Sequence, residues 1–328
     1  MISKKLFILL SLLAICVSAR SQITSTIISG AVFEAGTDNP ISNVSVYFDG
    51  SLNGTSTNKT GSFSLYPQSN TKIPLIISAF GYNTETITDY LLGKKLIIYL
   101  KPKMYDLESV TITASDGMSR EKKLKIFRQE FLGTSYIARN CEIVNESDIH
   151  LTYNKQTNTV KAFCDNPVIV RNKNLGYTFN FILQNFTSST QGTSFYGPQF
   201  FKEDVTEVNS DVLKAREKAY LGSRMHFIKS LWSNELQKNG FKVFRKTEND
   251  LNYDNIVVNH GEQKYLCLPA NTIVLYKKVQ SFVITDPGKE IFIDKDGYND
   301  PIGITWGGAI GNQRAADLLP LEYTLKEQ

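Results

Sequence analysis

The stretch from Gly30 to Leu65 decides the fold of the N-terminal part of the chain. It contains Gly-Ala-Val-Phe (30–33), Asn-Pro-Ile-Ser-Asn-Val-Ser-Val-Tyr-Phe (39–48) and Gly-Thr-Ser-Thr-Asn-Lys-Thr-Gly-Ser-Phe-Ser-Leu (54–65). Val44, Val46 and Phe48 alternate with their neighbours at the period of a half-buried strand. The segment 57–61 has turn chemistry, with an Asn that can bond its own backbone and a final Gly that tolerates positive φ. We therefore expect a meander of short antiparallel strands.

These residues resemble the carboxypeptidase regulatory-like domain, a prealbumin-like (immunoglobulin-like) β-sandwich. That domain is appended to zinc carboxypeptidases and stands at the front of many outer-membrane receptors of Gram-negative bacteria. The shared pattern is a turn with Pro-Ile, Gly-Thr-x-Thr, and Gly-x-Phe-x-Leu; Asn58 stands where the family usually has Asp. Ser78–Tyr82 and Leu96–Leu100 continue the resemblance over about residues 27–113. It implies a fold and carries almost no information about activity.

The rest of the chain has the mixed pattern of an α+β domain. A helix is expected from Ser119, as N-cap, to a stop at Gly133, with a basic face containing Arg120, Lys122, Lys123, Lys125 and Arg128. Period-two alternation from 149 to 202 predicts a second antiparallel sheet, and 211–239 predicts two helical segments ended by Gly240. Residues 273–325 are expected to be rich in strands. Arg120–Leu124, Phe131–Ser135, Ala219–Phe227 and Gly240–Val243 resemble exported bacterial proteins that pair this sandwich with an uncharacterised α+β module.

The first 21 residues have the pattern of a signal peptide. Lys4 and Lys5 precede the apolar run 6–17, and Ala19 and Ser21 satisfy the small-residue rule for cleavage before Gln22. Removing residues 1–21 takes three positive charges and no negative ones, so the net charge falls from +4 to +1. Such a balance gives no reason to expect a nucleic-acid partner, and no later apolar run reaches membrane-spanning length. The expected organisation is signal peptide 1–21, sandwich 22–103, linker or strand 104–118, and an α+β domain 119–328.

A zinc peptidase is the first activity to test against the sequence. The chain has three histidines, His150, His226 and His260, and none is followed three residues later by Glu. His260 and Glu262 could share a strand face, yet no second His lies near them in sequence. Since catalytic zinc needs several converging ligands, we predict neither a metal site nor a cofactor.

The three cysteines of the mature chain leave two possibilities open. Cys141 and Cys164 could form a disulfide, with Cys267 left over, or all three could be buried thiols. A cysteine nucleophile would need a histidine, for example Cys141 with His150 or Cys267 with His226, but no local signature supports such a pair. We therefore assign no catalytic residue.

Four further patterns have a structural explanation and a functional one. Asp294-Lys-Asp-Gly297, with Asn299 and Asp300, resembles a calcium loop, but a hairpin turn between 291–293 and 302–304 explains it equally well. The glycines of 307–311 are expected to form a loop. His226 is expected one turn into a helix that begins after Ser223. The helix dipole should disfavour the charged form of its side chain there, so we expect a packing role for His226. A set of aromatic residues could include a stacking platform for sugars, although most of its members should belong to the core. The set is Tyr177, Phe179, Phe181, Phe195, Tyr196, Phe200 and Trp306.

The sequence favours an exported, non-catalytic protein of the bacterial envelope, periplasmic or associated with the outer membrane. It would bind or scaffold an envelope protein or a glycan through the regulatory-like domain. Two alternatives stay open: a carbohydrate-binding accessory protein, and a hydrolase or peptidase with an unrecognised site in 119–328. The first would show exposed aromatic rings on one face, and the second would show clustered His, Cys or acidic residues in one cleft.

Overall fold

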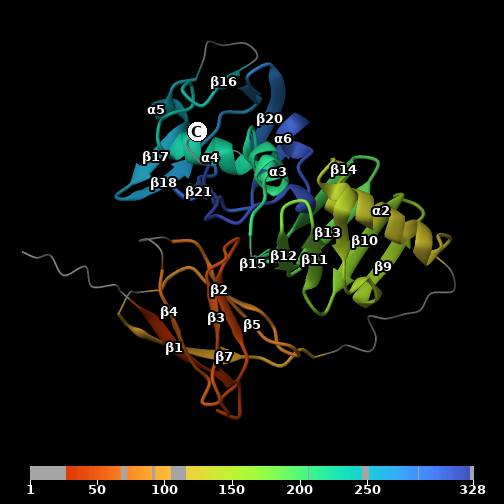
Figure 1. Ribbon diagram of the computed structural model, residues 1–328, viewed down its shortest axis with the longest axis vertical. Coiled ribbons are helices and arrows are strands. Elements are labelled where there is room, and N and C mark those ends of the chain that lie inside the picture. The colour runs from red at the N-terminus through yellow and green to blue at the C-terminus, as the bar shows by residue number, and fades with distance from the viewer. Residues whose placement is uncertain are drawn as a thin grey trace, which may run out of the picture.

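The computed structural model describes residues 27–67, 72–90, 93–104, 116–205, 207–245, 251–286 and 288–325. The expected signal peptide and most of the expected linker, 105–115, lie outside these residues. The described residues form three hydrophobic cores. In Figure 1 they correspond to a red-to-orange sandwich, a yellow-to-green layer beside it, and a teal-to-blue layer above (Figure 1).

The N-terminal part is a β-sandwich. One sheet has the order β4-β1-β7 and the other β3-β2-β5-β6. The strands are β1 Ile28–Glu34, β2 Ser45–Phe48, β3 Gly54–Ser56, β4 Ser62–Leu65, β5 Leu75–Ser78, β6 Glu85–Ile87 and β7 Lys95–Leu100. The expected simple meander is wrong, because β1 pairs with β7 in parallel and the chain crosses between the sheets. The turn before β4 forms as expected: the Asn58 side-chain oxygen Oδ1 accepts from the backbone amides of Thr60 and Ser62, and Gly61 has φ 73°.

The second core lies between two four-stranded sheets, where a single sheet was expected. Their orders are β14-β13-β10-β9 and β15-β12-β11-β8. Buried aromatic residues of alternate strand positions, such as Phe179, Phe181 and Phe186, fill the core. The strands are β8 Cys141–Ile143, β9 Ile149–Asn154, β10 Thr159–Cys164, β11 Val168–Asn172, β12 Tyr177–Phe181, β13 Asn185–Ser189, β14 Gly192–Tyr196 and β15 Gln199–Glu203; two short 3₁₀ helices are η1 Ala138–Asn140 and η2 Glu146–Asp148.

Helix α2, Arg120–Leu132, lies across the β9–β10–β13 side of this core (Figure 1). Ser119 caps its start and Gly133, with φ 96°, follows its end, as the sequence predicts. The expected basic face needs one correction. Lys123 is buried and forms an ion pair of 2.6 Å with Asp116, so it does not belong to the solvated face.

The third core is surrounded by helices and short strands of the C-terminal part. Its elements are α4 Arg224–Trp232, β16 Phe241–Arg245, α5 Tyr253–Ile256, β17 Val257–His260, β18 Gln263–Leu266, β19 Thr272–Tyr276, β20 Val279–Thr285, β21 Ile291–Ile293, β22 Ile304–Gly307 and α6 Gly308–Gly311. The second core receives α3, Ser210–Tyr220, and the short helix η3, Ala315–Asp317. Helix α4 ends at Trp232, eight residues before the expected stop at Gly240, and turns fill the interval.

The expected hairpin between 291–293 and 302–304 is also wrong. Strand β21 pairs with β18, whereas β22 pairs with β20, so the two segments belong to different sheets. The acidic segment between them still turns: Gly297 has φ 92°, and its amide donates to the Asp294 carbonyl oxygen at 3.0 Å. The turn chemistry was therefore correct and the pairing was not.

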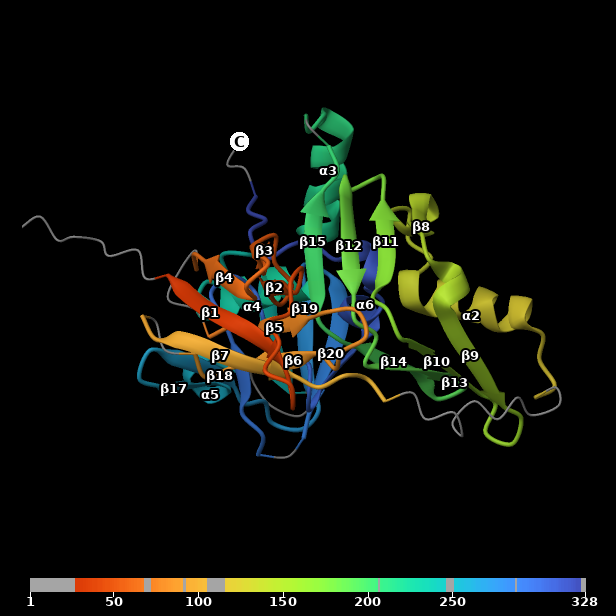
Figure 2. The same ribbon diagram turned by 90° about the horizontal axis from the view of Figure 1, so that it is seen from below.

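The C-terminal segment passes through all three cores in turn. Ile310 belongs to the third core, Ala315, Ala316 and Leu319 to the second, and Leu321 to the sandwich. Its backbone is also fixed to the sandwich, since the Leu321 amide donates to the Gly50 carbonyl oxygen at 2.9 Å. In Figure 2, which is seen from below, the sandwich lies in front of elements of the third core (Figure 2). The three cores are thereby joined into one packed body.

The turn after β2 and strand β15 also join the sandwich to the second core. The Gly50 amide donates to the Gln199 carbonyl oxygen, and the Phe201 amide donates to that of Ser51. The Tyr47 ring stacks on Phe200 at 4.7 Å between centroids. A Cβ at Gly54 would lie 2.6 Å from the Phe200 ring, so this glycine allows β15 to approach the sandwich. No helix in the described ranges is long and apolar enough to span a bilayer.

A buried arginine makes the second core sensitive to substitution. Arg216 is 6% exposed, donates to the Leu175 carbonyl oxygen and to Glu203, both at 2.8 Å, and lies 4.0 Å above the Tyr177 ring. We expect Arg216→Met to lower the free energy of unfolding by about 2 kcal/mol, because it leaves a buried carbonyl oxygen without a donor. Chemical denaturation followed by circular dichroism measures this.

The matched control for Arg216→Met is Arg171→Met, on strand β11 of the sheet that contains Tyr177 and Glu203. Arg171 is 3.8 Å from Glu142, and both side chains are about half exposed. Exposed pairs contribute roughly 0–1 kcal/mol, so this variant should unfold almost as the wild type does. Equal losses in the two variants would show that the burial of Arg216 has no special importance.

Candidate functional site

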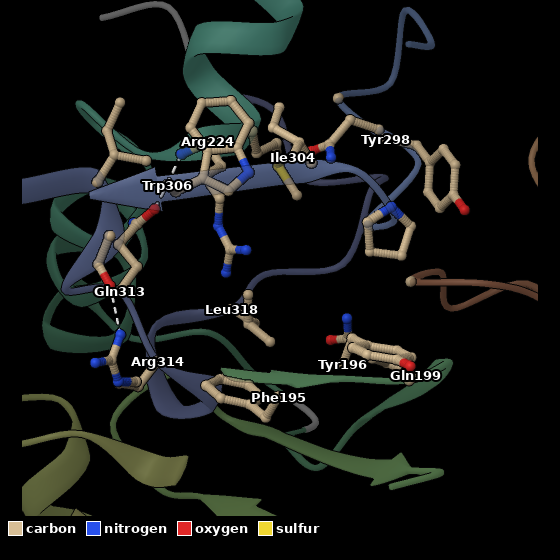
Figure 3. Close-up of a pocket in the computed structure, with 18 of the residues that line it drawn as sticks. Phe195, Tyr196, Gln199, Arg224, Tyr298, Ile304, Trp306, Gln313, Arg314 and Leu318 are labelled. Carbon is tan, nitrogen blue, oxygen red and sulfur yellow. Dashed lines mark hydrogen bonds between the residues drawn. The ribbon is translucent and has the colours of Figure 1, made fainter. Parts of the chain in front are cut away.

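The three cores meet around a cavity of about 300 Å³. Its wall is built from the Asp49–Gly50 turn of the sandwich, the β14–β15 connection, the start of α4, the segment around 297–306, and the C-terminal segment 310–321. Figure 3 shows the side chains that line it (Figure 3). Because each core contributes a wall, the cavity exists only when the sandwich is docked.

One end of the cavity is cationic. The Arg224 side chain reaches into the space above Leu318 and Phe195, with Trp306 beside it, and Arg314 lies farther along the same wall (Figure 3). Arg314 is held by Glu130 at 3.7 Å and donates to the Gly311 carbonyl oxygen. Among the described residues, the Arg224 guanidinium has no hydrogen-bond or ion-pair partner. Its donors are therefore free to meet a molecule in the cavity.

Local structure fixes Arg224 at this position. Ser223 caps α4 by accepting from the His226 amide at 2.9 Å, which makes Arg224 the first residue of the helix. The Arg224 amide donates to the Gln313 side-chain oxygen at 2.9 Å, and the Gln313 amide group donates to the Ala219 carbonyl oxygen at 3.3 Å. The backbone of Arg224 is thus anchored while its side chain faces the cavity.

The charge of Arg224 is not neutralised by its surroundings. Burial, and then the positive charge of Arg314, lower the pKa of Arg224 to about 10, against a smaller opposing effect of Asp317. The Asp317 carboxylate accepts from the Ser135 hydroxyl at 2.7 Å and from the Arg314 amide at 3.2 Å. Asp317 is therefore already engaged, and Arg224 is positively charged at neutral pH.

The other end of the cavity is polar. Tyr196 and Gln199 lie on one side of this end, and Tyr298 lies across the space from them (Figure 3). The Asp49 carboxylate accepts from the Gln199 amide at 2.8 Å, and burial raises the pKa of Asp49 to about 7 despite this bond. The bond to Asp49 uses the backbone amide of Gln199; the side-chain amide of Gln199 and the Tyr298 hydroxyl have no hydrogen-bond partner within the described ranges.

Between the two ends the lining is apolar and aromatic. Phe195 packs edge-on against Phe131 of the second core, and Trp306 packs edge-on against Phe227 of the third. These contacts anchor each ring to a core, and both rings also line the cavity. The cavity therefore combines a free cation, uncommitted polar groups and ring surfaces, which is the usual composition of a small-molecule site.

The histidines singled out in the sequence lie apart from one another. His150 is exposed and stacks on Phe163. His226 is buried among aromatic rings, and burial lowers its pKa to about 4; the direction agrees with the sequence argument, but burial is the cause, not the helix dipole. His260 contacts Glu290 at 2.7 Å on the surface. In the described ranges, no three His, Cys, Asp or Glu residues group as metal ligands.

The cysteines that the structure describes, Cys141, Cys164 and Cys267, are free thiols. Cys141 and Cys164 lie on β8 and β10, in different sheets, and burial raises their pKa values to about 12 and about 11. A thiol with a raised pKa is a poor nucleophile at neutral pH. Their sulfurs donate to carbonyl oxygens of Ile137 and Asp148. These contacts give no cysteine a catalytic partner.

The remaining candidates divide between the core and the cavity. Tyr177, Phe179 and Phe181 are buried, as expected for most of the aromatic set, and Phe200 covers Tyr47. Phe195, Tyr196 and Trp306 line the cavity, as do Gly297 and Asn299 of the acidic turn. Gly311 lines it too, but the loop expected at 307–311 is wrong, because Gly308–Gly311 form helix α6. Asp294, in contrast, is buried and caps its own turn by accepting from the Asp296 amide.

Sequence reasoning did not find Arg224, Gln199 or Asp49. The only local signal at Arg224 was its place directly after the helix cap Ser223, within the segment 219–227. Nothing in one sequence shows that residues 49, 199, 224 and 306 face the same space, since these positions belong to different cores. The site is a product of the docking of those cores.

Comparison with known proteins agrees with the N-terminal assignment. No curated protein matches the chain. The family model of the CarboxypepD_reg-like domain matches residues 28–112, a range that contains β1 to β7. The match covers about a quarter of the chain and confirms the expected similarity of the N-terminal β-sandwich to carboxypeptidase regulatory-like domains.

Proposed function

We propose that this protein is a non-catalytic binding protein of the bacterial envelope, exported by its N-terminal signal. Its ligand site is the cavity that the regulatory-like sandwich closes together with the rest of the chain. The observation that carries the proposal is the meeting of unpartnered polar groups, Arg224, Gln199 and Tyr298, at one cavity shared by all three cores.

The absence of catalysis is supported by the placement of the reactive residues. A general acid or base must reach the reacting atoms. His150, His226 and His260 do not line the cavity, and neither do the cysteines. Asp49 is the one carboxylate among the described residues that line the cavity, and general acid–base work on a glycosidic bond uses two. The cavity can hold a molecule but offers little to transform it.

The tryptophans allow a direct test of binding. The chain has two, Trp306 in the cavity wall and Trp232 next to Lys264 elsewhere in the third core. In a Trp232→Phe variant, the fluorescence of Trp306 reports on the cavity alone. We expect a saturable change in its emission when the variant is titrated with at least one member of a panel of neutral and charged sugars and amino acids.

The matched control is Trp306→Phe, which keeps Trp232 and should give no response to the same compound. Wild-type protein incubated with peptides and nitrophenyl glycosides should release no product, with or without a chelator. A response equal in both single-tryptophan variants would contradict the cavity as the site. Chelator-sensitive hydrolysis would overturn the non-catalytic assignment.

A further inference from the structure

We propose that the cavity binds an acidic sugar, a mono- or disaccharide with a carboxylate, and that Arg224 receives the carboxylate. This inference rests on the proposed function and adds the chemical class of the ligand. It makes Arg224 the residue that distinguishes acidic from neutral sugars.

The unpartnered guanidinium is the first argument. Structural arginines at the meeting of packed elements normally pair with a carboxylate or carbonyl oxygen, as Arg216 does here with Glu203 and Leu175. Arg224 has its backbone anchored and its side chain free toward the cavity. A guanidinium presents parallel N–H donors that match a carboxylate in two-point geometry. Its natural complement is an anion that enters from outside.

The neighbouring charges favour the same conclusion. The positive charge of Arg314 lowers the pKa of Arg224, so the two positive charges repel each other. Glu130 offsets Arg314, and Asp317 is engaged by Ser135 and the Arg314 amide. None of these acids contacts Arg224. A bound carboxylate would relieve the repulsion.

The size and lining of the cavity point to a sugar. About 300 Å³ is at the lower end for ligand pockets, which suits one or two sugar rings and excludes a folded partner. Trp306, Phe195 and Tyr196 supply ring surfaces on which the C–H faces of a sugar can pack. Gln199 and Tyr298 supply uncommitted donors and acceptors for hydroxyl groups at the far end. The polar end and the cationic end are thus separated by an apolar middle.

The test uses the full chain carrying Trp232→Phe, with Trp306 emission as the readout. The probes are D-galacturonic acid, its methyl ester, and D-galactose, each at the same ionic strength. We expect galacturonic acid to bind at least tenfold more tightly than the ester or galactose, because only the free acid forms the charged hydrogen bonds. Acetate, which has the charge but no ring, should bind far more weakly than the acid sugar.

The decisive variant is Arg224→Gln, which keeps the backbone bond to Gln313. We expect it to weaken galacturonic acid binding by about 10- to 100-fold and to leave the binding of the methyl ester unchanged. The matched control, Arg139→Gln, removes an exposed arginine outside the cavity and should bind as the parent does. Melting curves of both variants show whether the fold is retained.

The outcomes separate the two proposals. Equal binding of the acid and the ester, or undiminished acid binding in Arg224→Gln, would overturn the acidic-sugar inference and leave the cavity as a binding site. Tight binding of acetate or of a peptide carboxylate in place of the sugars would also overturn it. If no compound of the panel changes Trp306 emission, the proposed function itself fails.

Discussion

We expect a carboxylate at position 46 to unfold the N-terminal sandwich. Val46 is fully buried on β2, in the middle of the core formed by both sheets. Val46→Asp would bury a charge among side chains that offer it no partner, which costs several kcal/mol, roughly 4 or more. That is a large part of the stability of a domain of this size. Urea unfolding, followed by far-ultraviolet circular dichroism, should show loss of the native baseline.

Ser64→Asp is the matched control for this experiment. Ser64 lies on β4 between two core residues, Phe63 and Leu65, but its own side chain is exposed. The same charge introduced there should change the free energy of unfolding by less than about 0.5 kcal/mol. A Val46→Asp protein that unfolds at the same urea concentration as Ser64→Asp would contradict the position of β2 in the core.

The loss of folded sandwich in Val46→Asp should also disrupt the cavity. The sandwich supplies Asp49 and Gly50 to its wall, and Leu321 of the C-terminal segment is part of the sandwich core. In a partly folded Val46→Asp protein, the emission of Trp306 should therefore no longer change when ligand is added. Independent folding of the sandwich, residues 22–103, stays a prediction. Two residues outside that range contribute to it: Leu321 packs in its core, and Glu322 accepts a hydrogen bond from the Leu52 amide.

The sequence was informative where structure depends on near neighbours. Val44, Val46 and Phe48 are buried, as their alternation predicts. Ser119, Ser223 and Gly133 bound helices at the residues where caps and stops were expected. Each of these signals depends on residues a few positions apart, which one sequence contains in full.

The sequence was misleading where structure depends on distant pairing. The parallel pairing of β1 with β7, the division of 149–202 into two sheets, and the separation of β21 from β22 all join segments far apart in the chain. Alternation shows which side of a strand is buried but not which strand lies beside it. Lys123 is a similar case: its burial depends on Asp116, which precedes the helix and could not be recognised as its partner.

The candidate site could not be predicted for the same reason. Phe195, Tyr196 and Trp306 were noted as possible sugar contacts, but together with four aromatic residues that lie in the core or the junction. Arg224 was not noted at all. A cavity formed by three docked cores leaves no short motif, because its residues come from six separated segments.

The last prediction concerns two buried groups whose protonation should change stability in opposite directions. Burial raises the pKa of Asp49 from 3.8 to about 7, so between these pH values the folded protein holds a proton that the unfolded chain has lost. The contribution of Asp49 to the free energy of unfolding is fully present below about pH 4 and falls as the pH rises to about 7. Asp49→Asn keeps an acceptor for the Gln199 amide and removes the titration.

His226 acts in the opposite sense. Burial, and then the charge of Lys277, lower its pKa from 6.5 to about 4, so between these values the unfolded chain binds a proton that the folded protein does not. The contribution of His226 to the free energy of unfolding is fully present above about pH 6.5 and is lost as the pH falls to about 4. His226→Asn places an acceptor near the Gly222 amide, which donates to the ring at 3.1 Å, and removes the titration.

Because the two effects oppose each other, the wild-type stability should vary little between pH 4 and 7 on their account, and the variants should reveal both. At about 1.4 kcal/mol per pKa unit, the unfolding free energy of Asp49→Asn relative to wild type should rise by roughly 4 kcal/mol from pH 4 to 7. That of His226→Asn should fall by roughly 3 kcal/mol from pH 4 to 6.5. Urea unfolding at half-unit pH intervals measures both differences, and the opposite slopes serve as each other's control. Two differences of the same sign, or two that do not change with pH, would show that these side chains are not buried as the structure places them.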